Sequence, residues 1–421
     1  MAPPFEICEM VFNDLSASDI KTLALVSPDW KDVVQTKLFQ KVTLKLDDIP
    51  DLDFSADCLS KVDVVVVDAS GVGSWPEFPP FRPLPIFPHA RYLEITTFSC
   101  ESWSPQALAS IMGLFNSWTC TLAAVKSVCF TNSTLPGLIR LPPNVEEVKF
   151  KDVLLSLVPT TVESIPFDSL PKALSRLSID SYGMRGCNAA KDTEHILRDL
   201  TRFTAVVPVG NLTELRLSIC ASQTTAVAAL LDACPLLKDL QLSWGSSGNC
   251  TTCNIDSLTG LLPDISQLSQ LASIDVQVWC KPRSFISCAQ ALRGLKFSPS
   301  LQKMFVGIPF LGSDGSGEVD LARAMLEVAC RETARVTLQI SAIHSATFRH
   351  WELLQSEPSE LSQEYVDGLT RILAADKASA KVPQGAKFGL EVISSSSRDG
   401  LGWRVQRTLP CSRTEYLSVI N

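Results

Sequence analysis

The sequence offers few side chains whose type and spacing suit catalysis or metal binding. The best metal-like spacing is Cys250-Thr-Thr-Cys253, but a zinc site needs a second pair of ligands at a compatible distance. The next cysteines, Cys280 and Cys288, do not form such a pair, and no histidine lies close in sequence. We interpret Cys250 and Cys253 as an unbridged pair in a surface loop, with zinc binding or redox chemistry as the alternative.

Patterns typical of catalysis are equally scarce. The four histidines, at positions 89, 195, 344 and 350, lie outside any HExxH pattern, and the chain has no GxSxG nucleophile elbow. The glycine-rich segment 312–317 lacks the ending of a phosphate loop and is interpreted as a turn. These observations predict a protein that is not an enzyme and needs no metal or cofactor. The alternative is an enzyme whose active site matches none of these motifs.

Composition and charge exclude further classes of protein. The 421 residues are 46% hydrophobic and 19% charged, which is typical of folded globular chains. The net charge is −8 and no basic block is present, so we expect neither nucleic-acid nor membrane binding. Acidic residues within the first 20 positions do not fit a secretory signal. We expect a cytoplasmic or nuclear protein whose fourteen cysteines are reduced.

Residues 4–42 have the pattern of three short helices. In the first, two apolar stripes that include Ile7 and Val11 together cover about 220° of the helix wheel. A helix that packs on one core needs an arc of only about 100°, so this helix can contact two bodies. The third helix is predicted to have Ser27 as its cap and Pro28 as its first residue.

This segment resembles an F-box. The resemblance is carried by Pro4-Phe-Glu-Ile-Cys-Glu-Met-Val-Phe-Asn-Asp-Leu15, by Ser18-Asp-Ile and by Leu23-Ala-Leu-Val-Ser-Pro-Asp-Trp30. Pro3 departs from the family pattern, which usually has Leu there. The family's module docks on the small Skp-type adaptor of a cullin-based ubiquitin ligase, so the resemblance implies this adaptor and, through it, a cullin as partners.

The same resemblance implies an adaptor-binding surface with its supporting core. Ile7 and Val11 are the stronger contact candidates because they lie on the wide apolar arc. Leu23 and Trp30 have the alternative role of holding the helices together, since large buried side chains are more often packing residues. The full set of candidates is Pro4, Ile7, Val11, Leu15, Leu23, Val26 and Trp30.

A short pattern, apolar-x-x-apolar-x-apolar, recurs after residue 89. Alternate apolar residues turn one side of a strand toward a core, so each copy predicts a strand. The central apolar positions are 93, 128, 148, 177, 215, 240, 274, 304 and 336. Helices are predicted between strands at 104–118, 192–206, 224–233 and 319–332.

The repeated pattern resembles leucine-rich repeats, most closely at 212–217 and 237–242. The implied fold is α/β, in which an N-terminal three-helix F-box precedes an irregular, right-handed parallel β-α solenoid of leucine-rich-repeat type. Such a chain resembles the fungal-type F-box family. The alternative is a non-repeat α/β domain with ordinary strand patterning.

The domain organisation follows from these patterns. We expect an F-box-like helical module at 1–42 and the leucine-rich-repeat-like solenoid at 90–345. Between them, 43–89 is predicted to be a linker with two entry strands, at 42–46 and 62–67, and a proline-rich loop. Residues 346–421 are predicted to form a C-terminal cap, with a helix at 359–378 and a strand at 388–393.

Within each predicted strand, the residue between the last two apolar positions points away from the core. These residues, and those just before each central position, mix positive and negative charges, which favours a protein target over a polyanion. Phe305 is an aromatic residue among polar neighbours, as is typical of interface anchors. The alternative is a solvated face without a partner. The candidates for target binding are Lys149, Arg176, Glu214, Arg216, Asp239, Asp275, Lys303 and Phe305.

Together these features predict the substrate-recognition subunit of a Skp–cullin–F-box ubiquitin ligase. The F-box would hold the ligase, and the repeat array would hold a target protein whose identity the sequence does not give. Its effect would be to raise the local concentration of that target near the conjugating enzyme. The alternative is a non-catalytic protein-interaction scaffold that acts outside a cullin ligase.

Overall fold

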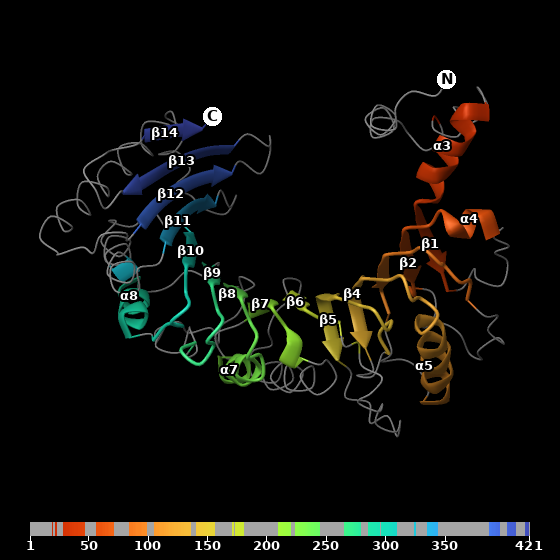
Figure 1. Ribbon diagram of the computed structural model, residues 1–421, viewed down its shortest axis with the longest axis horizontal. Coiled ribbons are helices and arrows are strands. Elements are labelled where there is room, and N and C mark those ends of the chain that lie inside the picture. The colour runs from red at the N-terminus through yellow and green to blue at the C-terminus, as the bar shows by residue number, and fades with distance from the viewer. Residues whose placement is uncertain are drawn as a thin grey trace, which may run out of the picture. The chain divides into compact units, whose positions relative to one another are not determined.

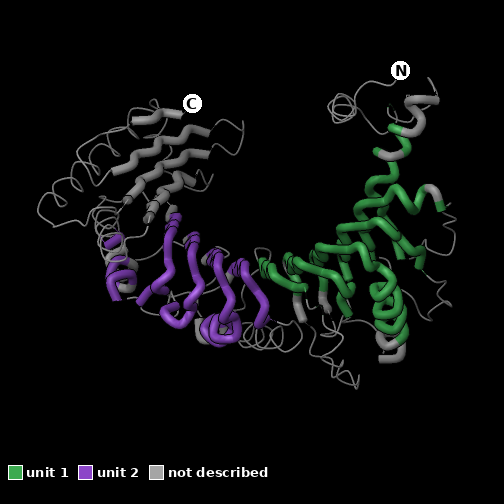
Figure 2. Tube along the Cα trace, viewed as in Figure 1, with its two compact units in different colours: residues 1–181, 205–208 green, residues 182–204, 209–421 purple. Residues whose placement is uncertain are grey.

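The computed structural model of the 421-residue chain falls into two compact units, one formed by residues 1–181 with 205–208 and the other by 182–204 with 209–421 (Figure 2). The structure describes residues 19, 22, 28–46, 56–70, 84–98, 105–135, 140–155, 171, 173–180, 209–219, 224–244, 265–278, 285–294, 296–309, 324–325, 335–343, 387–395, 402–409 and 417–420.

The first unit is an α/β structure with six parallel strands (Figure 1). Each strand pairs in parallel with its neighbour in sequence. Its helices are α3 (Pro28–Phe39), α4 (Ala56–Ser60) and α5 (Pro105–Thr119). Its strands are β1 (Lys41–Lys45), β2 (Val64–Asp68), β3 (Tyr92–Thr96), β4 (Ser127–Leu135), β5 (Glu147–Leu155) and β6 (Arg176–Asp180).

The second unit also pairs strands in chain order, in parallel from β7 to β12 and antiparallel from β12 to β14. Figure 1 shows α7 and α8 on one side of strands β7 to β10. The helices are the 3-10 turn η4 (Val209–Asn211), α7 (Thr224–Asp232) and α8 (Phe285–Gly294). The strands are β7 (Glu214–Ile219), β8 (Asp239–Trp244), β9 (Ser273–Val278), β10 (Lys303–Pro309), β11 (Arg335–Ile343), β12 (Lys387–Ser395), β13 (Gly402–Leu409) and β14 (Leu417–Ile420).

The strand register confirms the nine strands predicted from the repeated pattern. In the first unit, the predicted central residues Leu93, Val128, Val148 and Leu177 lie side by side. In the second unit, Leu215, Leu240, Ile274, Met304 and Val336 do the same. The first eight of these nine side chains are buried, so the alternation of apolar residues does mark the side of each strand that packs on the core.

A common turn precedes the strands of both units. In the eight patterns whose first residue the structure describes, the backbone N–H of that residue donates to the carbonyl three residues earlier, at 3.0–3.4 Å. The donors are Ala90, Val125, Val145, Leu174, Leu212, Leu237, Leu271 and Leu301. The same backbone turn therefore recurs before eight of the predicted strands, which is consistent with a solenoid-like α/β fold.

The core of the first unit contains clustered aromatic rings. Phe130 and Phe150, on adjacent strands, stack with their centroids 5.3 Å apart. Phe115 of α5 makes edge contacts with Phe98 and with Trp118 at 5.8 Å and 6.1 Å. These side chains are at most 5% exposed, so α5 is fixed to its strands by ring packing.

Several helix predictions are also confirmed. Helix α5 matches the prediction at 104–118, α7 matches 224–233, and α3 begins at Pro28 as predicted. In α7, Val227, Leu230 and Leu231 have the predicted helical spacing and are buried. The predicted helices at 192–206 and 359–378 lie outside the described residues, and of 319–332 only Ala324 and Met325 are described.

The structure adds elements that the sequence patterns did not predict. Helices α4 and α8 were not expected, nor were strands β13 and β14. The predicted strands at 42–46, 62–67 and 388–393 are present as β1, β2 and β12. Because β2 pairs with β3, the segment predicted as a linker contributes its two strands to the same sheet as the repeats.

Candidate functional site

The polar side of the strands in the second unit brings together most of the predicted target-binding residues. We define row A as Glu214, Asp239, Ser273 and Lys303, which lie in register on β7 to β10. We define row B as the residues two positions later, Arg216, Gln241, Asp275 and Phe305, which are likewise in register. Both rows alternate with buried apolar residues, so they lie on the side of the strands away from the core.

A hollow of about 280 Å³ lies on this polar side. Its lining comes from three successive strands, and it contains three carboxylates and one guanidinium group. The lining residues are Glu214, Leu215, Arg216, Asp239, Leu240, Gln241, Ser273 and Asp275. Four of the eight predicted target-binding residues, Glu214, Arg216, Asp239 and Asp275, therefore meet at one hollow of the molecule.

Asp275 is a carboxylate of the hollow that two glutamine side chains hold. Gln277 Nε2 donates to its Oδ1 at 3.0 Å, and Gln241 Nε2 donates to its Oδ2 at 3.2 Å. Burial raises the pKa of Asp275, although these two hydrogen bonds and the nearby Arg216 guanidinium oppose the change. Asp275 is thus a positioned group in the wall of the hollow and has less contact with solvent than the sequence pattern alone suggested.

Gly307 makes room for the side chain that holds Asp275. A Cβ atom at this position would collide with Oε1 of Gln277. Gly307 and Gln277 are partners in the register of β10 and β9. The absence of a side chain at 307 therefore lets Gln277 lie across the neighbouring strand and reach Asp275.

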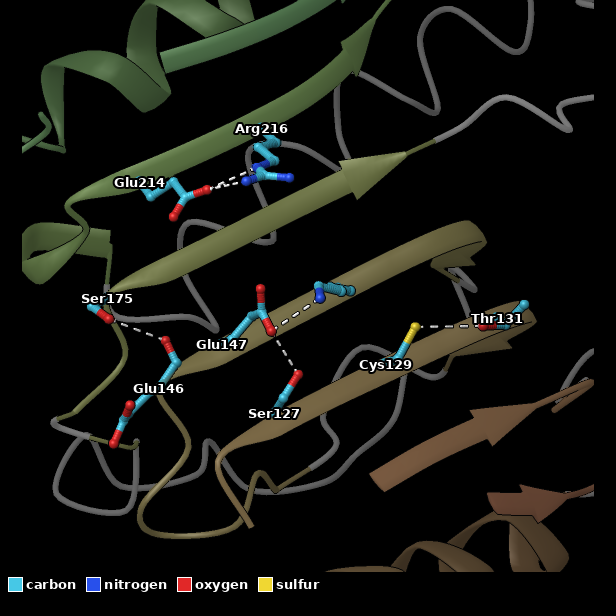
Figure 3. A network of polar contacts seen from close by, with 9 residues as sticks. Ser127, Cys129, Thr131, Glu146, Glu147, Ser175, Glu214 and Arg216 are labelled. Carbon is cyan, nitrogen blue, oxygen red and sulfur yellow. Dashed lines mark hydrogen bonds and ion pairs between the residues drawn. The ribbon is translucent and has the colours of Figure 1, made fainter. Parts of the chain in front are cut away.

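Glu214 and Arg216 form an ion pair on strand β7, at the edge of the hollow (Figure 3). Arg216 Nε donates to Glu214 Oε1 at 2.8 Å, and a second guanidinium nitrogen contacts the same oxygen. The Arg216 side chain is 58% exposed, so solvent weakens this pair. Both groups remain accessible to a partner.

Beyond the hollow, row A and row B continue to Lys303 and Phe305. Lys303 is exposed, and Phe305 is half-buried beside Asp275 in the register. Strands β11 and β12 extend row A in register through Arg335 and Lys387. The aromatic residue predicted as an anchor thus lies two residues along β10 from the basic residue of row A.

The polar side of the first unit carries the remaining two predicted residues, Lys149 and Arg176. Lys149 Nζ lies 3.0 Å from Glu147 Oε2, which also accepts a hydrogen bond from the Ser127 hydroxyl at 2.8 Å (Figure 3). Burial opposes ionisation of Glu147, but these contacts and the Arg176 charge leave its pKa below the usual value. The charges here are largely neutralised within the strand face.

Cys129 shows that a residue on the polar side of the strands is not always exposed. It lies in register between Glu94 and Lys149, on the polar side as predicted, yet it is fully buried. Its Sγ lies 3.6 Å from Thr131 Oγ1, and its thiol also contacts the Tyr92 hydroxyl. Neighbouring polar side chains cover the small thiol, so a position on the polar side does not ensure contact with solvent.

The structure also shows functional neighbours that the sequence prediction did not include. Ser273 lines the hollow, and Gln277 positions Asp275. Ser273 lies in register with the predicted residues Asp239 and Lys303, so the strand pairing points to it. Gln277 lies in register with Ser243 and Gly307, neither of which was predicted, and its uncharged side chain gave no signal in the sequence.

Of the predicted adaptor-binding residues, Trp30 alone lies within the described part of the chain. Pro4, Ile7, Val11, Leu15, Leu23 and Val26 lie outside the described residues. Trp30 is the third residue of helix α3, which runs from Pro28 to Phe39. The residues Cys250, Cys253 and the glycine-rich segment 312–317 also lie outside the described part of the chain.

Within the described ranges, no group of three or more histidine, cysteine, aspartate or glutamate side chains is arranged to hold a metal ion. His89 is exposed. Cys234 of the second unit is buried, its thiol donates to the Leu230 carbonyl, and burial raises its pKa to about 12. That thiol therefore stays protonated near neutral pH and serves as a packing group.

Comparison with known proteins identifies an F-box domain at residues 4–41. This match coincides with the segment in which the sequence pattern resembles an F-box, and it includes α3. A search of curated proteins found no match for the chain. Among the residues that the structure describes, no helix is both long enough and apolar enough to cross a membrane.

Proposed function

We propose that this chain is the substrate-recognition subunit of a Skp–cullin–F-box ubiquitin ligase. The observation that carries the proposal is the F-box domain at residues 4–41, since F-box domains bind Skp-type adaptors of cullin ligases. Such proteins are typically adaptors without catalytic activity of their own. The chain would act by raising the concentration of a target near the conjugating enzyme.

The strand faces support a role in target binding. Parallel strands paired in chain order, each preceded by the same turn, are what a leucine-rich-repeat-like solenoid requires, and we propose that fold for residues 90–345. Solenoids present long rows of side chains that the core does not use. Rows A and B are such rows, with charges of both signs and one half-buried aromatic residue.

We propose the hollow and its extension along rows A and B as the target site. Of the candidates on the first unit, Lys149 is paired within its own face, so it is a weaker anchor than the exposed Lys303. Glu214, Arg216, Asp239 and Asp275 border one hollow, which is the arrangement that a partner side chain can enter. A site of this kind would recognise the target by charge and shape together.

Affinity capture of the intact protein under proteasome inhibition tests the proposal. We expect a Skp-type adaptor and a cullin to be captured together, with ubiquitinated proteins that accumulate only when the proteasome is inhibited. Capture of the adaptor without a cullin would instead support the alternative, a scaffold that acts outside a cullin ligase. Capture of neither would contradict the proposed function.

A further inference from the structure

Row A of the second unit is polarised along its length. Negative residues occupy its β7 and β8 positions, an uncharged residue follows on β9, and positive residues occupy β10 to β12. In register order the residues are Glu214, Asp239, Ser273, Lys303, Arg335 and Lys387. Neighbouring strands lie about 4.8 Å apart, so the charge changes sign within about 10 Å, between β8 and β10.

The two charges nearest this change of sign are available to a partner. The side chains of Asp239 and Lys303 are exposed, and neither forms an ion pair or hydrogen bond with any other described residue. Ser273, which lies between them in the register, is small and lines the hollow. A partner can therefore reach both charges without first breaking an internal ion pair.

The hollow at the negative end has a fixed wall. Gln241 and Gln277 hold the Asp275 carboxylate, and Gly307 leaves the space that Gln277 occupies. Three carboxylates and one guanidinium group line the hollow, which leaves it with net negative charge when all are ionised. A cationic side chain that enters would meet the Asp275 carboxylate already in place, so this group would need little ordering on binding.

We propose that row A binds an extended segment of the target protein whose own charges have the opposite polarity. A lysine or arginine of the segment would enter the hollow beside Glu214 and Asp239, and an acidic residue would meet Lys303. This inference rests on the proposed role of the strand face in target capture. A uniformly acidic or uniformly basic segment would be repelled at one end of row A.

The geometry also sets the spacing within the segment. Asp239 and Lys303 lie two strands apart, or about 10 Å, and an extended chain advances about 3.3 Å per residue. The basic and acidic residues of the segment should therefore be about three positions apart. This spacing holds for either direction of the bound segment. A segment that runs in the opposite direction needs only the opposite order of its basic and acidic residues.

Selection from a random dodecapeptide library displayed on phage, with the folded full-length protein as bait, tests the inference. The informative variant is Asp239→Lys with Lys303→Asp. It keeps the net charge of the protein but exchanges the negative charge on β8 with the positive charge on β10. Its matched control is Asp232→Lys with Lys296→Asp, an identical swap at exposed positions outside rows A and B. Circular dichroism of both variants verifies that the strands remain folded.

We expect the unmodified protein and the control to enrich peptides with basic and acidic residues about three positions apart. The row A variant should bind these peptides at least about tenfold more weakly, which corresponds to the loss of two modest charge contacts. Equal binding by the row A variant, enrichment of peptides with one sign of charge, or enrichment of no peptide would each overturn the inference. Because adaptor capture depends on residues 4–41, it is measured separately, and its failure would contradict the proposed function without affecting this result.

Discussion

Asp275 illustrates how a side chain in the proposed target site can oppose stability when it is ionised. Its carboxylate is partly buried beside the hollow, and burial raises its pKa in spite of two hydrogen bonds from glutamine side chains. A group with a raised pKa in the folded state favours folding less when it is ionised. The hollow thus retains a carboxylate that a purely structural role would not favour.

Asp275→Asn should change the pH dependence of stability. In the unmodified protein, the folded state holds the Asp275 proton more tightly than the unfolded state does. The contribution of this residue to the free energy of unfolding is therefore greatest below the ordinary pKa of 3.8 and falls as pH rises to the raised folded-state value. Urea unfolding between pH 3.5 and 7 should show a flatter profile for Asp275→Asn. An unchanged profile would contradict the raised pKa.

Gly307→Ala should disturb the hollow with little cost to the core. The added Cβ would collide with Gln277, whose side chain must move and lose its hydrogen bond to Asp275. We expect the free energy of unfolding to fall by about 0.5–1.5 kcal/mol, the usual net value of one hydrogen bond. Gly294→Ala is the matched control, since nothing lies within 4 Å of its Cβ position. Equal effects of the two substitutions would argue against the close contact.

At the scale of secondary structure, the connection before β3 depends on helix α5. Trp118 of α5 is 3% exposed, and its indole Nε1 donates to the Pro85 carbonyl at 2.8 Å. The same ring makes an edge contact with Phe115. One side chain therefore ties a proline-containing connection, 33 residues away in sequence, to the helix that covers the core.

Trp118→Phe separates these two contributions. The smaller ring keeps an aromatic contact with Phe115 but leaves the Pro85 carbonyl without its donor. We expect the free energy of unfolding to fall by about 1–3 kcal/mol, as measured by chemical denaturation. Ser117→Ala, on the exposed side of the same helix, should change it by less than about 0.5 kcal/mol. If Trp118→Phe left the free energy of unfolding unchanged, the hydrogen bond to Pro85 would contribute nothing to stability.

The strands were predictable because their signal is strong and local. Alternation of apolar residues identified nine strands, and the structure pairs their central residues in register within each unit. Helix α8 was missed because Ala289 and Leu292, the residues of this helix described as buried, form a single i, i+3 pair, which is too short an apolar pattern to predict a helix. Strand β14 has only four residues, too few for a period of two to be recognised.

The candidate site was predictable as a set of positions but not as a set of contacts. The pattern assigned Glu214, Arg216, Asp239 and Asp275 to one side of the strands, where the structure has them. It did not reveal the Glu214–Arg216 pair or the burial of Cys129, because both depend on side-chain conformation and on neighbouring strands. Pairing across strands needs the register, which follows from the whole fold.

At the scale of the whole molecule, the proposed function assigns two activities to separate parts of the chain. The double variant Ile7→Asp with Val11→Asp should abolish adaptor binding while the strands stay folded. A buried, unpaired charge in an interface costs several kcal/mol, and a loss of about 3 kcal/mol already weakens binding more than a hundredfold. Pull-down of the Skp-type adaptor measures the effect, and circular dichroism reports on the strands.

A control for this variant is Asn13→Asp, which adds one negative charge at a position of the same predicted helix that is outside its two apolar stripes. This control should bind the adaptor normally and should capture the same target proteins. Survival of adaptor binding in the Ile7→Asp, Val11→Asp protein would mean that the contact surface has been placed on the wrong side of the helix.

The pairing of each strand with its neighbour in sequence also bears on how the chain can change over evolution. Within the first unit the aligned positions 93, 128 and 148 are separated by 35 and then 20 residues, yet their register is the same. The backbone hydrogen bonds thus fix the strands while the connecting segments differ widely in length. Insertions and deletions in a connection would leave the polar rows on the strands aligned, so new loops can be acquired at the rim of the sheet without rebuilding the surface between them.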